Sequence, residues 1–187
     1  MILPDVLAPG LGLVICGTAP SRRSAAEAAY YAHPGNLFWR TLHATGLTPE
    51  LLRPAQYREV LRYGIGLTDL AKHEFGSDAE LTRTAFDPAG LREKLERFRP
   101  AAIAFDSKTA GQGFLGRGIA HYGRQPERVG ETLIFVVPSP SGRARSYWDE
   151  APWREVAAFV AERRATRAPV QGSAGPSLSG EGRGEQR

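Results

Sequence analysis

Carboxylates follow two short apolar runs of this sequence, at positions where catalytic side chains often lie. Asp69 comes directly after IGLT, and Asp106 comes directly after AAIAF. A carboxylate in such a place can orient a water molecule or stabilise a cation that develops during a reaction. Both residues also have a structural interpretation, because Asp is common in turns and as a helix N-cap, a role that Ser107 could equally take beside Asp106.

A third apolar run, residues 11–16, ends in the segment GTAPS, residues 17–21. The segment has no carboxylate, amide or imidazole. It also lacks the lysine and the second glycine of the phosphate-binding fingerprints. What it offers is backbone N–H groups and, at Ala19, room for a flat ligand. GTAPS therefore predicts the wall of a pocket, with a tight strand-to-loop turn as the structural alternative.

The segment PSPSGRAR, residues 138–145, is a stiff loop with small hydroxyls and two arginines. Its prolines restrict the backbone, and its side chains can bind phosphate oxygens. The serines are not indicated as nucleophiles, because no G-x-S-x-G pattern surrounds them. An ordinary surface turn is the alternative. Lys108, elsewhere in the chain, can reach phosphate or only solvent.

Aromatic residues crowd residues 30–39, YYAHPGNLFW. An aromatic face can stack on a nucleobase, and each such stack contributes about 1–3 kcal/mol. We expect Phe38 and Trp39 to be core residues of the helix that begins there. Tyr31 precedes that helix and can face a ligand. Asn36 is a helix N-cap or a catalytic amide, and the cap is favoured.

Apolar runs alternate with helical patterns, which predicts an α/β fold. We expect a three-layer α/β/α sandwich around a short, mainly parallel sheet of four to five strands. Ligands of such folds bind beyond the carboxyl ends of the strands, where the segments described above all lie. The predicted strands are residues 11–17, 65–70, 101–105 and 132–139. The predicted helices are residues 37–46, 55–64, 87–100, 108–118 and 148–164.

Composition narrows the class of protein. The net charge is +4, and all but three of the 24 cationic residues are arginines. Arginine binds phosphate well, so a polyanionic partner is indicated, although GC-rich coding explains the arginines equally well. The single cysteine, Cys16, excludes an internal disulfide and argues against zinc or iron–sulfur clusters. No apolar run is long enough to span a membrane and the N-terminus lacks the basic-then-apolar pattern of a signal peptide, so we expect a cytoplasmic protein.

The last twenty residues differ from the rest in composition. Residues 168–187 are rich in Gly, Ser and Pro and nearly devoid of large apolar side chains. Such a segment cannot bury enough surface to offset the entropy lost on ordering. We therefore expect a single domain over residues 1–167 and a disordered tail over residues 168–187.

Four segments, taken in order, resemble the mismatch-specific uracil/thymine-DNA glycosylase family of the uracil-DNA glycosylase superfamily. They are GTAPS, AHPGNLFWRTLHATGLTP, YGIGLTDL and SPSGRAR, and the similarity spans roughly residues 13–159. The second segment is the most specific, because a Pro-Gly-Asn-x-Phe-Trp run before a helix is unusual. GTAPS alone would be weak.

The resemblance implies a monomeric hydrolase of base excision repair that needs no metal or other cofactor. Such an enzyme flips uracil from a G:U mismatch out of double-stranded DNA and hydrolyses its N-glycosidic bond, which leaves an abasic site. The candidate substrate-binding residues are Gly17, Thr18, Ala19, Ser21, Tyr31 and Asn36. The candidate DNA-binding residues are Lys108, Ser139, Pro140, Ser141, Gly142, Arg143 and Arg145.

Two positions depart from the family pattern. The family's first motif reads Gly-Ile-Asn-Pro-Gly, and its Asn positions the attacking water, whereas this chain has Ala19 there. In the family, the loop that enters the duplex commonly carries an apolar wedge, whereas this chain has Arg143 at that position. We predict that Asp69 supplies the catalytic carboxylate, because its strand adjoins the first one in the superfamily's sheet, with Asp106 as the reserve. Ala19 also supports an alternative, a non-catalytic nucleic-acid-binding protein that retains the glycosylase fold.

Overall fold

The computed structural model describes residues 2–167, apart from the side chains of Arg83 and Arg143. Its centre is a five-stranded sheet with the strand order β2-β1-β3-β5-β4. β4 is antiparallel to β5, and the other neighbouring strands are parallel. The strands are β1 (Leu13–Gly17), β2 (Ile65–Asp69), β3 (Ala102–Phe105), β4 (Gly123–Val129) and β5 (Thr132–Val136).

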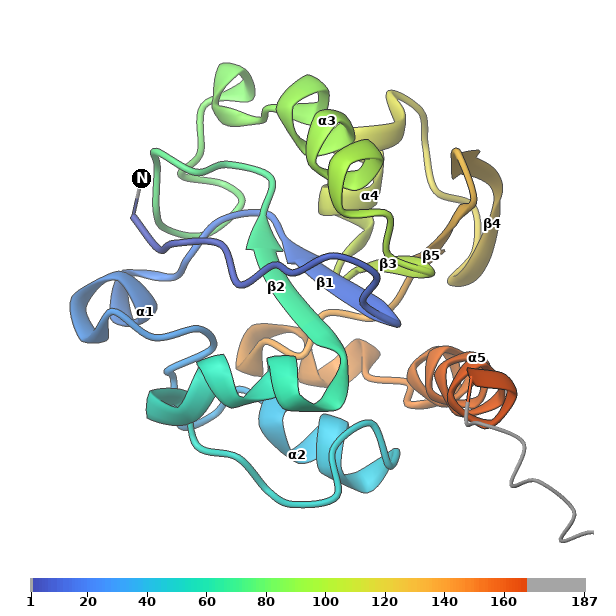
Figure 1. Cartoon of the computed structure of the whole chain (residues 1–187). Coiled ribbons are helices and arrows are strands. Elements are labelled where there is room, and N and C mark those ends of the chain that lie inside the picture. Colours follow the sequence, from blue (N-terminus) through green and yellow to red (C-terminus); the bar gives the residue numbers. More distant parts are fainter. Residues whose placement is uncertain (1, 168–187) are drawn as a thin grey trace, which may run out of the picture.

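Helices cover both faces of this sheet (Figure 1). Alternate residues of a strand point to opposite faces, so Ile15 packs in the core beside α2, η1 and α5, whereas Val14 packs beside α3 and α4. The predicted three-layer α/β/α fold is confirmed. The helices are α1 (Arg22–Glu27), α2 (Phe38–Ala44), η1 (Pro54–Tyr63), η2 (Arg83–Ala85), α3 (Pro88–Phe98), α4 (Lys108–Leu115), η3 (Gly142–Tyr147) and α5 (Ala151–Arg167).

Local signals set the ends of several helices as expected. The Asp87 carboxylate accepts the backbone N–H of Gly90 at 2.8 Å and caps α3, with Pro88 in the first turn. The Asn36 side chain accepts the backbone N–H of Phe38, the first residue of α2, at 2.9 Å. The N-cap position itself is Leu37, which makes no side-chain capping bond, so the N-cap prediction for Asn36 is wrong by one residue. Gly64 ends η1 at a φ of 69°, in the left-handed region that glycine enters without a steric cost.

Several elements differ from the expectation, among them the short 3₁₀ helices η2 and η3, which were not predicted. The predicted helix over residues 55–64 is a 3₁₀ helix, η1. The short helix α1 was not predicted, and neither was β4. The sequence of β4, GRQPERV, alternates buried and exposed residues for most of its length and contains a proline. A central strand rarely has this pattern, but an edge strand tolerates it, because one side of its backbone needs no partner.

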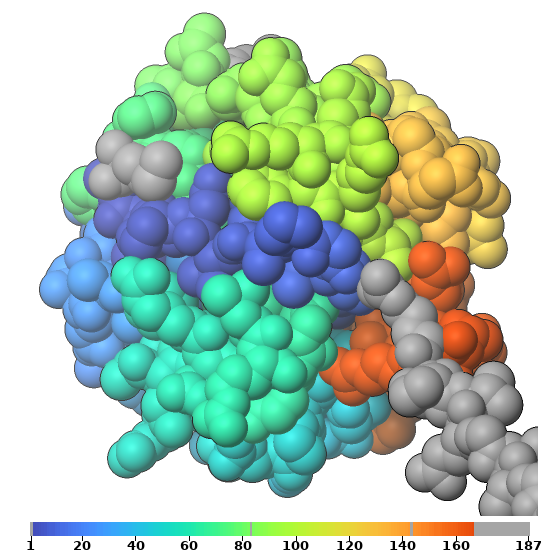
Figure 2. Space-filling view, viewed as in Figure 1, coloured from blue at the N-terminus to red at the C-terminus, as the bar shows by residue number. Residues whose placement is uncertain are grey.

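The N-terminal segment runs across the outer side of β2, between α3 and η1, as the blue atoms in Figure 2 show. Val6 forms an antiparallel bridge with Leu67 of β2. Ile2 donates its backbone N–H to the carbonyl of Lys72 at 2.9 Å. This path covers the exposed edge of β2 and brings Asp5 beside the carboxyl end of that strand.

None of the described helices, within residues 2–167, is both long and apolar enough to cross a lipid bilayer. The predicted disordered tail, residues 168–187, lies outside the residues that the structure describes.

Candidate active site

Two buried carboxylates flank Gly17 at the carboxyl ends of adjacent strands. A methyl group built onto Gly17 would lie 3.2 Å from Oδ1 of Asp69 and 3.6 Å from both carboxylate oxygens of Asp106. Asp69 and Asp106 expose only 5% and 7% of their surfaces. The structure therefore brings both predicted carboxylates to one place, with the first residue of GTAPS between them.

The sheet and a helix cap position these carboxylates. Gly17 is the register partner of Asp69 in the parallel β1–β2 pair. On the other side, Asp106 donates its backbone N–H to the carbonyl of Cys16 at 3.1 Å. The Ser107 hydroxyl accepts a backbone N–H from the first turn of α4 at 3.0 Å. Because Ser107 caps that helix, the carboxylate of Asp106 is not used for capping.

Tyr31 lies at this site and contacts Asp106 directly. Its hydroxyl donates a hydrogen bond to Oδ2 of Asp106 at 2.8 Å. Its ring stacks on Phe38 with 3.6 Å between the ring centroids. The backbone of Tyr31 has a φ of 52°, a conformation that costs a non-glycine residue free energy and often marks functional sites. One face of the ring is therefore occupied by Phe38, and stacking on a flipped base stays a prediction for Tyr31.

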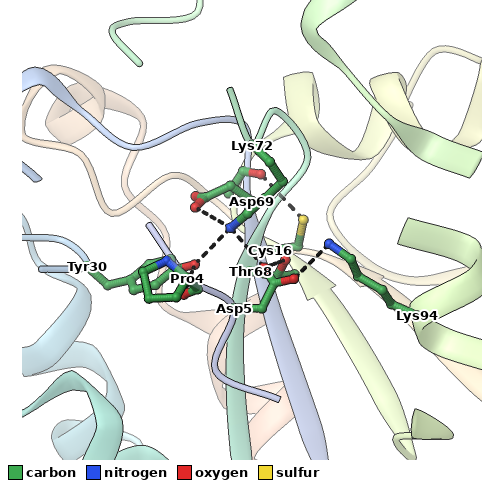
Figure 3. A network of polar contacts seen from close by, with 9 residues as sticks. Pro4, Asp5, Cys16, Tyr30, Thr68, Asp69, Lys72 and Lys94 are labelled. Atoms are coloured by element: carbon green, nitrogen blue, oxygen red, sulfur yellow. Dashed lines mark hydrogen bonds and ion pairs between the residues drawn. The ribbon is translucent and has the colours of Figure 1, made fainter. Parts of the chain in front are cut away.

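On its other side, Asp69 faces a buried lysine (Figure 3). Nζ of Lys72 lies 3.5 Å from Oδ2 of Asp69 and 2.8 Å from Oδ1 of Asp5. Among the described residues, the Lys72 ammonium group at 3.5 Å is the donor that approaches Oδ2 of Asp69, and at that distance it leaves the oxygen without a well-formed hydrogen bond. A buried carboxylate oxygen without a well-formed hydrogen bond is costly, and such atoms are typical of sites that bind water or substrate.

Burial makes both carboxylates unusually basic. Desolvation raises the pKa of Asp69 to about 6, although the Lys72 ammonium group opposes this rise. Desolvation also raises the pKa of Asp106 to about 7, where the Tyr31 hydrogen bond opposes the rise and the charges of Asp69 and Asp78 add to it. Two neighbouring carboxylates with raised pKa values are typical of catalytic sites. A base with a pKa near the working pH also transfers protons most effectively.

The raised pKa of Asp106 predicts a pH-dependent stability difference for Asp106→Asn. With a folded-state pKa of about 7 against the ordinary 3.8, the folded protein holds a proton that the unfolded chain releases. Ionisation therefore weakens the wild type progressively as the pH rises from 4 towards 7, but it does not affect the Asn variant. In urea unfolding, we expect Asp106→Asn to gain about 2 kcal/mol more relative to wild type near pH 8 than near pH 5. An equal difference at both pH values would contradict the raised pKa.

The loop that follows β2 lies along GTAPS. The Thr18 hydroxyl donates to Oδ1 of Asp78 at 2.7 Å. Two backbone N–H groups of the same loop, from Ala71 and Gly76, donate to the carbonyls of Thr18 and Pro20 at 2.7 and 2.9 Å. Backbone carbonyls of GTAPS are therefore held by hydrogen bonds from the loop after β2. The sequence did not indicate that this loop contributes to the site.

The other predicted residues of GTAPS have different surroundings. The Ser21 hydroxyl accepts the backbone N–H of Ser24 at 3.1 Å and caps α1, so it has a structural role. Ala19 is half-buried. Within residues 2–167, the backbone N–H groups of Thr18 and Ala19 donate no hydrogen bond. These backbone N–H groups can bind a negatively charged edge of a ligand, while the nearby carboxylates can direct a water molecule to attack it.

The loop after β5 packs against the loop before α2. The Pro140 carbonyl accepts the backbone N–H of Leu37 at 2.8 Å. Nη2 of Arg145 donates to the carbonyl of Gly35 at 3.4 Å. A methyl group on Gly142 would lie 3.2 Å from the same carbonyl oxygen. The two loops therefore form one surface at the carboxyl end of the sheet.

The remaining candidate DNA-binding residues have no contact with the loop before α2 among the contacts described above. The Ser139 hydroxyl accepts the backbone N–H of Ser141 at 3.3 Å. Lys108 begins α4, and its Nζ lies 4.9 Å from the centre of the Tyr122 ring. The Arg143 side chain lies outside the described part of the chain. Contacts between these residues and DNA stay predictions.

Comparison with known proteins identifies the family. The model of the uracil DNA glycosylase superfamily matches residues 4–161, which is most of the chain. The chain belongs to the uracil DNA glycosylase superfamily. This membership gives it a DNA glycosylase-like role with DNA as its partner.

A solved structure agrees with the superfamily fold. The solution NMR structure of a candidate uracil DNA glycosylase from Methanosarcina acetivorans matches with a TM-score of 0.57 and 24% sequence identity. The match covers 86% of this chain and 96% of that one. At this level of identity the likeness shows the fold, and it assigns no substrate to this superfamily member.

Sequence reasoning missed several residues around the site. Lys72 lies three positions after Asp69, a spacing that could have indicated an ion pair. Asp5 gave no signal, because its contact depends on the path of the N-terminal segment. The same holds for Asp78, which contacts Thr18 from a position 60 residues away. Tyr147 is 80% exposed at the end of η3, beside the predicted DNA-binding loop.

Proposed function

We propose that this chain hydrolyses the N-glycosidic bond of uracil in DNA, with uracil opposite guanine as the preferred substrate. The observation that carries the proposal is the pair of buried carboxylates flanking Gly17, with pKa values near neutrality. We further propose that residues 1–167 act as one domain and as a monomer, which sedimentation can check.

The proposed reaction begins when uracil leaves the base stack and its sugar reaches the carboxylates. The bond between C1′ and N1 breaks, the sugar gains oxocarbenium character, and the base departs as an anion. Backbone N–H groups of Thr18, Ala19 and Tyr31 stabilise that anion. Asp69 orients a water molecule and takes its proton as the water oxygen bonds to C1′. No side chain of GTAPS is needed for the proton transfer.

Asp69 is a better candidate than Asp106 for this proton transfer. Asp106 accepts the Tyr31 hydroxyl, whereas Oδ2 of Asp69 accepts no well-formed hydrogen bond from the described residues and has only the Lys72 ammonium group 3.5 Å away. The Lys72 ammonium group lowers the pKa of Asp69 and so favours its ionised form, whereas the charges of Asp69 and Asp78 raise the pKa of Asp106. Asp69 is therefore the carboxylate whose surroundings favour the state that accepts a proton.

DNA engagement is assigned to the loop after β5, with Arg143 filling the space that the flipped base leaves. We expect Arg143→Ala to lower base flipping by about tenfold or more while changing duplex affinity less, because one phosphate contact contributes little to total binding. Fluorescence of 2-aminopurine beside the uracil reports flipping, and anisotropy reports binding. The matched control is Arg145→Ala. Equal losses in flipping and binding for Arg143→Ala would argue instead for an ordinary phosphate contact.

The test of the function itself uses the wild-type protein and a panel of duplexes. Uracil opposite guanine, uracil opposite adenine, single-stranded uracil, thymine opposite guanine, hypoxanthine and ethenocytosine are each incubated with the protein and then cleaved with alkali. We expect strand cleavage at uracil opposite guanine first. Ala19 favours one second candidate, a non-catalytic nucleic-acid-binding protein. Tight binding across the panel without cleavage would support that candidate.

A further inference from the structure

Lys72 is a buried cation between two carboxylates, one of which is the proposed catalytic base. Its side chain is 8% exposed, and that of Asp69 is 4% exposed. An ammonium group is rarely buried so fully unless it is paired, because desolvation favours its neutral form. The burial of Lys72 between Asp5 and Asp69 therefore suggests a role other than packing in the core.

The partner that holds Lys72 in place is Asp5. Nζ of Lys72 lies 2.8 Å from Asp5, which also accepts the Thr68 hydroxyl at 2.7 Å and pairs with Lys94 at 2.7 Å. Nζ of Lys72 also donates to the Tyr30 hydroxyl at 3.3 Å. These contacts fix the ammonium group independently of Asp69. Figure 3 shows it lying between the N-terminal segment and the end of β2.

The charges around Asp69 are otherwise negative or neutral. Three charged groups face Asp69. They are Lys72 in the loop after β2, Asp5 in the N-terminal segment, and Asp106 at the end of β3. The remaining titratable groups whose pKa values Asp69 affects are Cys16, Tyr30 and Tyr31, and burial raises the pKa of each, which keeps them neutral. In the described part of the chain, Lys72 is the only cation within 4 Å of Asp69.

We propose that Lys72 is a positioning residue that keeps Asp69 ionised and oriented for water attack. The inference rests on the proposed function, in which Asp69 is the base. Lys72 touches neither the reacting atoms nor the DNA in this scheme, and it acts only through its charge on Asp69. The cation 3.5 Å away offsets the cost of holding an ionised carboxylate out of water.

The experiment is the pH dependence of single-turnover uracil excision by Lys72→Met. Removing the cation raises the pKa of Asp69, so the rising limb of the profile should move to higher pH by about 1–3 units. Excision near pH 6 should then fall about tenfold or more, and it should recover to within about threefold of wild type near pH 9. Lys72→Arg retains the charge and should restore the midpoint to within about half a unit.

Lys94→Met is the matched control, because Lys94 pairs with the same Asp5 but does not contact Asp69. Its profile should keep the wild-type midpoint. A uniform loss at every pH in Lys72→Met would mean a structural role only and would overturn the inference. The double variant Asp69→Asn with Lys72→Met should be no slower than Asp69→Asn alone. If Asp69→Asn itself retains wild-type excision, the proposed function of Asp69 fails, whatever Lys72→Met does.

Discussion

Asp69→Asn is expected to lower single-turnover excision of uracil by about 10²–10⁴-fold, the range that loss of a general base produces. Asn has nearly the same shape, but it can neither take a proton nor stabilise a cation by charge. Lys72 keeps its partner Asp5 in this variant, so the surrounding network is retained. Affinity for the uracil-containing duplex should stay within about threefold, because phosphate contacts dominate it.

Asp106→Asn, assayed beside it, separates the two carboxylates. Its amide oxygen can still accept the Tyr31 hydroxyl, so we expect a smaller loss than in Asp69→Asn, about tenfold. Thermal unfolding of both variants checks that they fold. Excision near the wild-type rate by Asp69→Asn would remove Asp69 from the mechanism, and a much larger loss in Asp106→Asn would transfer the role to Asp106.

Gly17→Ala is expected to lower excision by about 10–10²-fold, because small displacements of reacting groups have effects of that size. The added methyl group would lie 3.2 Å from Oδ1 of Asp69 and 3.6 Å from both oxygens of Asp106. It would crowd both carboxylates and displace them from their positions beside Gly17. Gly17 does not have a positive φ, so alanine introduces no backbone strain.

Gly118→Ala controls for this substitution, because a methyl group there meets no atom within 4 Å. Its single-turnover rate should equal that of the wild type. Thermal unfolding should show that Gly17→Ala remains folded, and its duplex affinity should be retained. Full activity in Gly17→Ala would mean that the reaction does not depend on the positions of the two carboxylates beside Gly17.

The sequence was sufficient to predict which residues meet at the carboxyl end of the sheet. Parallel strands end at one edge of a sheet, so the apolar runs before Gly17, Asp69 and Asp106 implied that these residues meet. The burial of Phe38 and Trp39 in α2 followed from local pattern in the same way. These predictions succeeded because each depends on neighbouring residues in the chain and on one rule of topology.

The parts that the sequence did not predict depend on contacts between distant segments. The buried Lys72 pairs with Asp5, which the N-terminal segment brings to it along the outer edge of β2, and no local pattern encodes that path. Thr18 meets Asp78 through a loop whose course no periodicity indicates. β4 escaped prediction because edge strands tolerate polar residues and proline. Tertiary context therefore determines the electrostatics of the site more than its location.

The most direct test of the account measures free uracil released from a G:U duplex by the wild-type protein, in single turnover, across the pH range. We predict stoichiometric release of uracil, with a rate that rises as Asp69, whose pKa is about 6, loses its proton. Below that pKa the rate should fall about tenfold for each unit of pH. Duplex binding without release of uracil at any pH would contradict the account.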